Sequence, residues 1–102
     1  MSEVHKLRAV RAIVRPDRRE AYLEGWKVYA GAAREIGAEV RLFEDQLVPG
    51  RFLELTEHVA RAGAEGALVR AAQQAELKRL CVRREGEDLL YREARFDTGE
   101  DG

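Results

Sequence analysis

Adjacent apolar residues recur within the segments of this chain that have the composition of β-strands. The pairs are Ile13 and Val14, Leu42 and Phe43, Phe52 and Leu53, and Leu89 and Leu90. Because successive side chains of a strand point to opposite faces of a sheet, each pair places one apolar group on either face. A sheet built from these segments is therefore predicted to have no fully hydrophilic face, and each face needs a cover.

The hydrophobic pattern predicts four strands, at residues 7–14, 39–47, 52–59 and 88–96. A first helix is expected to begin at Pro16 or Asp17 and to end before Gly37, a natural C-cap. A second helix is expected over 67–83, ended by Gly86, with Arg83 and Arg84 as solvated residues near its negative end. The resulting order is β-α-β-β-α-β.

The segment 48–51, Val-Pro-Gly-Arg, predicts a tight turn that joins the second and third strands into a hairpin. If the hairpin pairs Leu47 with Arg51, Glu44 lies opposite Glu54. One face of the hairpin then carries Val40, Leu42, Glu44, Gln46, Phe52, Glu54, Thr56 and His58.

Right-handed crossovers place both helices on one face of a four-stranded antiparallel sheet, which is the ferredoxin-like α+β arrangement. The other face then remains apolar and open. A short chain buries only about two thirds of its unfolded surface, so additional burial in an oligomer is favourable. We therefore expect a symmetric homodimer that packs sheet face against sheet face.

Length and charge limit the function classes. The 102 residues suit one domain, with an ordered core at about 7–96 and a flexible acidic tail at 97–102. A net charge of −1 argues against nucleic acid as a partner. There is no signal-peptide pattern and no apolar run of membrane-spanning length, and Cys81 is the single cysteine. We expect a cytoplasmic protein with no membrane partner.

The element order, the hairpin FEDQLVPGRFLELTEH and the helix opening after RPDRREAYLEGW resemble the dimeric α/β-barrel superfamily over roughly residues 7–96. That superfamily includes antibiotic-biosynthesis-type and haem-degrading monooxygenases and stress-responsive barrels. The resemblance implies a cofactor-independent oxygenase or an isomerase acting on an aromatic or polyketide-like substrate. Residues 60–83 contain no histidine, which such monooxygenases commonly carry there, so the resemblance assigns no catalytic residue.

Several residues could carry chemistry. His58, among carboxylates and a hydroxyl, could act as a general base, although a hydrogen-bonded histidine at a strand end is the more common role. Glu44 and Glu54, if opposed, could raise one carboxyl pKa, and Thr56 lies beside them. These three are candidate ligand-binding residues.

Tyr22, Trp26 and Tyr29 form a stripe on the first helix that could line a ligand pocket, although such stripes more often pack in the core. Cys81 is expected to be a small core residue rather than a nucleophile. No nucleotide, zinc or calcium motif occurs, and we expect neither a metal nor a cofactor.

The leading hypothesis is a homodimer that binds a small, partly apolar molecule between its helices and sheet, with His58 as the base if it is an enzyme. The alternative is a non-catalytic ligand-binding or stress-response module. A less favoured alternative is a subunit that docks on another protein through a sheet edge.

Overall fold

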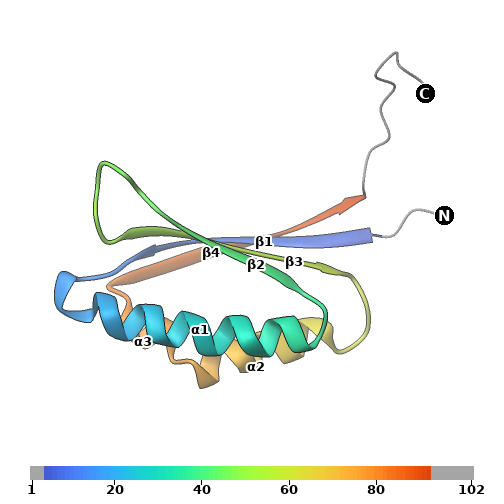
Figure 1. Cartoon of the computed structure of the whole chain (residues 1–102). Helices are drawn as coiled ribbons and strands as arrows, with labels where there is room; N and C mark the ends of the chain where they lie inside the picture. Colours follow the sequence, from blue (N-terminus) through green and yellow to red (C-terminus); the bar gives the residue numbers. More distant parts are fainter. Residues whose placement is uncertain (1–3, 93–102) are drawn as a thin grey trace, which may run out of the picture.

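The computed structural model describes residues 4–92. Eight elements follow one another: β1 (Val4–Ile13), the 3-10 turn η1 (Pro16–Arg18), α1 (Arg19–Glu35), β2 (Glu39–Glu44), β3 (Arg51–Val59), α2 (Ala64–Gln74), α3 (Leu77–Leu80) and β4 (Arg83–Arg92). The helices lie together on one face of the sheet, and the loop between β2 and β3 rises on the other side (Figure 1). The predicted 97–102 tail and the last residues of the predicted fourth strand lie outside the described residues.

The strands form one sheet in the order β2-β3-β1-β4, and every neighbouring pair is antiparallel. This is the predicted ferredoxin-like topology, in which β1 and β3 occupy the centre. We call the sheet face that packs against the helices the inner face and the opposite face the outer face. Even-numbered residues of β1, β2 and β3 lie on the inner face, where Val10, Ala12, Val40 and Phe52 join the core.

Helix α1 covers the middle of the inner face. Pro16 opens η1 because its missing N–H and fixed φ suit the first helical position. The stripe of Tyr22, Trp26, Tyr29 and Ala33 is buried, as its helical spacing predicts. Gly37 has φ of 85° and donates its N–H to the carbonyl of Arg34, which confirms it as the residue that ends the helix.

The hairpin register differs from the prediction by two residues. Glu44 lies opposite Phe52, and Glu54 lies opposite Leu42, so the predicted Glu44–Glu54 opposition is wrong. The reason is the loop: β2 ends at Glu44, and the carboxylate of Asp45 accepts hydrogen bonds from the N–H groups of Leu47 and Val48. A two-residue shift preserves the face of every side chain, so the predicted hairpin face is retained.

The second helix ends earlier than predicted. It breaks at Glu76, whose φ is 56°, and a short turn of helix, α3, follows with the fully buried Leu77. Arg83 belongs to β4, and Gly86 lies within that strand rather than ending a helix. The gain from pairing β4 along the whole of β1 outweighs the helix propensity of this segment. Gly86 permits that pairing, since a Cβ there would lie 2.6 Å from Cγ2 of Val10.

The apolar pairs divide between the two faces. Leu42 and Phe52 lie on the inner face, whereas Phe43 and Leu53 lie on the outer face. Ile13 and Phe43 are 41% and 49% exposed on that outer face. The prediction that apolar groups project from both sides is thus confirmed for the hairpin strands; the Leu89 and Leu90 side chains lie outside the described ones.

Candidate functional site

Three successive inner-face positions of the central strand β3 are polar. Glu54, Thr56 and His58 are only 2%, 3% and 8% exposed. Polar side chains are rarely so deeply buried in a small domain unless they are satisfied by partners or serve a function. We call these three residues the polar row.

Glu54 is held by two partners from different elements. The hydroxyl of Tyr22 on α1 donates to Oε2 at 2.6 Å. Arg84 on β4 donates from Nη2 to Oε1 at 2.7 Å and from Nε to Oε2 at 3.2 Å, which is a bidentate pair. The Arg84 and Glu54 side chains are 12% and 3% exposed, so this ion pair is largely withdrawn from water.

The strand order explains how Arg84 reaches Glu54. β1 separates β4 from β3, and the β1 residue directly across from Arg84 is Ala12, which is fully buried. The small Ala12 side chain leaves room for the long arginine side chain to cross the strand. The sequence reading of Arg84 as a solvated residue at a helix end is therefore wrong, because it depended on the helix continuing to Arg83.

Thr56 is held from the helix layer. Its hydroxyl and that of Tyr29 share a hydrogen bond of 2.7 Å, with either atom as donor. Tyr22 and Tyr29 are seven residues apart, two turns of α1, so both hydroxyls point to the same strand. Glu54 and Thr56, two inner-face residues of β3, are thus each hydrogen-bonded to the hydroxyl of one tyrosine of α1.

Burial raises the pKa of Tyr22, and the neighbouring Glu54 carboxylate raises it further, so this hydroxyl stays protonated and acts as a donor. Burial also raises the pKa of Tyr29. For Arg84, burial alone lowers the pKa, but the hydrogen bond and charge of Glu54 outweigh it and the net direction is upward. The cluster therefore contains a fixed ion pair and two neutral phenols.

A groove of about 360 Å³ opens beside the polar row. Its described lining residues come from the sheet, α2 and α3: Arg8, Val69, Ala72, Gln73, Glu76, Lys78, Arg79 and Arg84. Arg84 binds Glu54, and Arg8 lies directly across from Thr56 in the β1–β3 pairing. We call this the cationic groove, and two of its lining residues are therefore neighbours of members of the polar row.

His58 lies at the far end of the row and is not among the described lining residues of the cationic groove. Its Nδ1 is 3.1 Å from the carbonyl oxygen of Val59. If Nδ1 carries the hydrogen that this contact requires, Nε2 is left as the basic nitrogen. The base role of His58 stays a prediction.

The other predicted residues have separate surroundings. Glu44 binds Arg19 at 2.6 Å and accepts the N–H of Gly50 at 3.0 Å. The hydrogen bond from Arg19 lowers its pKa. Trp26 is buried and packs against Tyr29 with ring centroids 5.1 Å apart. The structure thus brings Tyr22, Tyr29, Glu54 and Thr56 together and leaves Glu44 outside that cluster.

Sequence reasoning missed Arg8 and Arg84. Arg8 lies within a predicted strand. Arg84 is two residues before Gly86, so the two residues would share a sheet face if this segment had been predicted as a strand.

Among the side chains that the structure describes, no three His, Cys, Asp or Glu groups gather as a metal site would require. None of the helices within residues 4–92 is both long enough and apolar enough to cross a bilayer.

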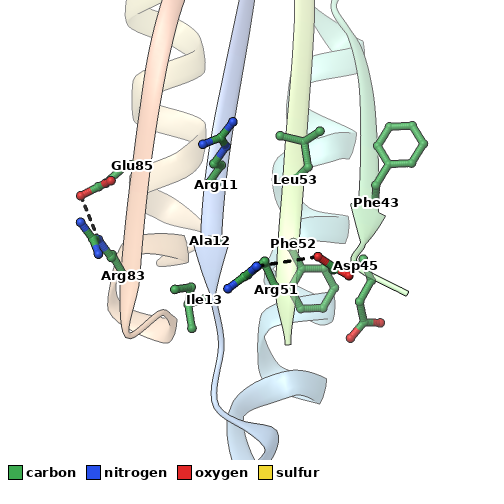
Figure 2. Close-up of a pocket in the computed structure, with 11 residues that line it drawn as sticks. Arg11, Ala12, Ile13, Phe43, Asp45, Arg51, Phe52, Leu53, Arg83 and Glu85 are labelled. Atoms are coloured by element: carbon green, nitrogen blue, oxygen red, sulfur yellow. Dashed lines mark hydrogen bonds and ion pairs between the residues drawn. The ribbon is translucent and has the colours of Figure 1, made fainter. Parts of the chain in front are cut away.

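A second hollow, of about 590 Å³, lies on the outer face. Figure 2 shows Arg11, Ile13, Leu53 and Phe43 projecting from the sheet toward the viewer, with the helices behind it. Two ion pairs flank these four residues, Arg83 with Glu85 at 2.9 Å and Arg51 with Asp45 at 3.9 Å. This surface combines apolar groups with Arg11, which lies on the central strand β1 between Leu53 and Glu85, and it has charged pairs at its edges.

Cys81 lies near the ion pair and its thiol is weakly acidic. Burial, followed by the charge of Glu54, raises its pKa to about 11. At pH 8 we expect its alkylation by iodoacetamide to be roughly 100-fold slower than in the urea-unfolded chain, because the thiolate is the reacting form. In the folded protein the rate is expected to keep rising to about pH 11. A plateau below pH 9.5 would contradict the assignment.

Comparison with solved structures identifies the fold. The structure of "Putative antibiotic biosynthesis monooxygenase from Nitrosomonas europaea" matches with a TM-score of 0.70 at 16% identity, over 91% of this chain and 92% of that one. The fold is that of the antibiotic-biosynthesis-monooxygenase structures. The predicted ferredoxin-like α+β fold is thereby confirmed.

Two further structures agree. An antibiotic biosynthesis monooxygenase matches with a TM-score of 0.66 at 16% identity, over 89% of this chain and 99% of that one. Protein SO0527 from Shewanella oneidensis matches with a TM-score of 0.73 at 13% identity, over 90% and 95% of the two chains. The sequence matches no family model and no curated protein. At these identities the likeness concerns the monooxygenase-like fold alone.

Proposed function

We propose that this chain binds a small, partly apolar molecule in the cationic groove. The molecule would lie next to Arg84, which contacts the polar row through Glu54. The observation that carries the proposal is the burial of Glu54, Thr56 and His58 at three successive inner-face positions of a central strand. A buried ion pair is poor evidence of added stability, since an apolar replacement of similar volume is often as stable. A role in binding or catalysis accounts for the retained polarity.

The reaction that suits this site begins with loss of a proton from a carbon beside a carbonyl or phenol, as in cofactor-independent oxygenation or in isomerisation. The neighbouring folds named as monooxygenases support the first of these. Negative charge then develops on the substrate oxygen, and a preorganised guanidinium such as Arg84 stabilises it. His58, the histidine of the polar row, is the base in this proposal.

We also propose that two chains form a homodimer through their outer faces, in the cytoplasm. Ile13 and Phe43 are about half exposed there, and Leu53 lies directly across from Phe43 on the neighbouring strand. In a chain of 102 residues, covering this surface adds to a small core. The charged pairs at its edges suit the polar rim of an interface.

The alternative, a non-catalytic ligand-binding or stress-response dimer, is favoured by one observation. His58 is not among the described residues that line the groove, and the one acid that does, Glu76, is bound by Arg79 at 3.2 Å. The two functions differ in whether a bound compound is consumed.

A ligand screen tests the proposal. We expect phenols, aromatic acids or 1,3-dicarbonyl compounds to raise the melting temperature at pH 7.5. Consumption of a stabilising compound that occurs under oxygen but not under argon, with a product of higher mass from added oxygen, indicates an oxygenase. Conversion that continues under argon to a chromatographically distinct product of unchanged mass indicates an isomerase. Stabilisation without consumption indicates the non-catalytic alternative, and an absence of any stabilising compound contradicts the ligand site.

The base assignment has a matched control in the second histidine. If turnover is found, His58→Ala should lower kcat by about 100-fold or more, whereas His5→Ala, in β1 on the outer face, should leave it unchanged. Full activity in a folded His58→Ala variant would remove His58 from the mechanism and leave binding in the groove unaffected.

A further inference from the structure

Cations outnumber acids among the described residues that line the cationic groove. Among its described lining residues are four cations, Arg8, Lys78, Arg79 and Arg84, and one acid, Glu76. Glu76 is already engaged with Arg79. Arg84 is likewise paired, with Glu54, so the exposed Lys78 adds a cation to a groove in which two of the other cations already have carboxylate partners.

Arg84 presents hydrogen-bond donors as well as charge. Its pair with Glu54 uses Nε and one hydrogen of Nη2. A guanidinium has five N–H donors in one plane, so this pair leaves three of them for other acceptors. Because Glu54 also orients the guanidinium, a ligand oxygen would meet donors whose geometry is already fixed.

The remaining lining is suited to an apolar body. Val69, which is 43% exposed, and Ala72 extend along α2 at the same groove. A volume of about 360 Å³ falls within the range of small-molecule pockets, which combine apolar walls with a few placed polar groups. The groove therefore offers cations at its floor and rim and aliphatic groups on one wall.

We propose that the ligand of the cationic groove is an organic anion whose carboxylate, enolate or phenolate oxygen is bound by Arg84 and whose apolar body lies on Val69 and Ala72. Lys78 and Arg79 at the rim draw the anion in and add to its affinity. This inference rests on the proposed function and deepens it by naming the charge class of the substrate.

A matched pair of probes tests the charge class. 2-Naphthoate and 2-naphthalenemethanol share one apolar body and differ in charge. By calorimetry at pH 7.5 and low salt, we expect the acid to bind at least tenfold more tightly than the alcohol. Raising the salt concentration should lower the affinity for the acid and leave the affinity for the alcohol unchanged, because salt screens charge.

Variants at the rim locate the binding. Lys78→Glu/Arg79→Glu should lower the affinity for the acid at least tenfold and that for the alcohol less than twofold. The Arg79 side chain is 79% exposed, and Lys78 is also exposed, so the fold should tolerate the change. The control is Lys27→Glu, on α1 and 73% exposed, which should affect neither probe. Lys78→Arg/Arg79→Lys keeps the charges and should keep the affinity.

The outcomes separate the two proposals. If the alcohol binds as tightly as the acid, the protein binds the apolar body but the anion inference is wrong. If the acid binds and the reversal at Lys78 and Arg79 has no effect, the anion is not bound in this groove and the inference is also wrong. If neither probe binds, the ligand site itself is contradicted together with the inference.

Discussion

Replacement of Arg84 by methionine is expected to lower the free energy of unfolding by about 3–5 kcal/mol. Glu54 is 2% exposed, and its carboxylate would retain only the hydroxyl of Tyr22 among its present partners. A buried charge without its counterion costs several kcal/mol, which is more than the mutual attraction of an exposed pair contributes. Urea unfolding at pH 7.5, followed by circular dichroism, measures the change.

The neighbouring arginine is the control. Arg83 precedes Arg84 on the same strand, faces the other way and pairs with Glu85 at 65% exposure of both side chains. Arg83→Met should change the free energy of unfolding by less than about 0.5 kcal/mol.

A double variant separates desolvation from attraction. Arg84→Met/Glu54→Leu removes both charges and should be more stable than Arg84→Met alone, because no charge is then left buried. If Arg84→Met costs less than about 1 kcal/mol, Glu54 does not depend on the guanidinium, and the basis for a preorganised Arg84 is lost.

The sequence was sufficient for features whose cause is local. Gly37 ends α1 because a positive φ of 85° is required there, and the spacing of Tyr22, Trp26 and Tyr29 fixes one helical face. The assignment of hairpin residues to faces was also correct although the register was not. A strand alternates with a period of two, so an error of two residues leaves every side chain on its proper side.

The predictions that were wrong mostly concern residues whose partners are distant in the sequence. The end of the second helix is decided by β1, since Arg83 begins pairing opposite Ile13. Local helix propensity in this segment contains no information about that pairing. For the same reason Arg84 could not be predicted as the partner of Glu54, thirty residues away. The register of the hairpin was predicted wrongly because Asp45, and not only the Pro-Gly pair, shapes the turn.

Phe43→Asp is expected to raise the dissociation constant of the proposed homodimer by more than about 100-fold. Phe43 is 49% exposed beside the outer hollow shown in Figure 2. Burying a phenylalanine contributes about 1.5–3 kcal/mol, and in a two-fold dimer each change occurs twice. A loss of about 3 kcal/mol or more corresponds to that change in affinity. Sedimentation velocity over a concentration series measures it.

A second exposed apolar residue provides the control. Val28 is 58% exposed on α1, in the helix layer, so Val28→Asp should leave the dimer intact. Both variants should retain the wild-type circular dichroism spectrum, since each residue is already in contact with water in the single chain.

The proposed dimer and the proposed ligand site are on different faces of the sheet, and this experiment tests whether they are independent. The polar row and the described lining of the cationic groove lie within one chain, between its helices and the inner face, whereas Phe43 lies on the outer face. A wild-type protein that is monomeric at micromolar concentration would contradict the dimer and leave the ligand site standing. A dimer insensitive to Phe43→Asp would show that another surface pairs the chains. If Phe43→Asp yields a monomer that still binds 2-naphthoate, one subunit contains the whole site.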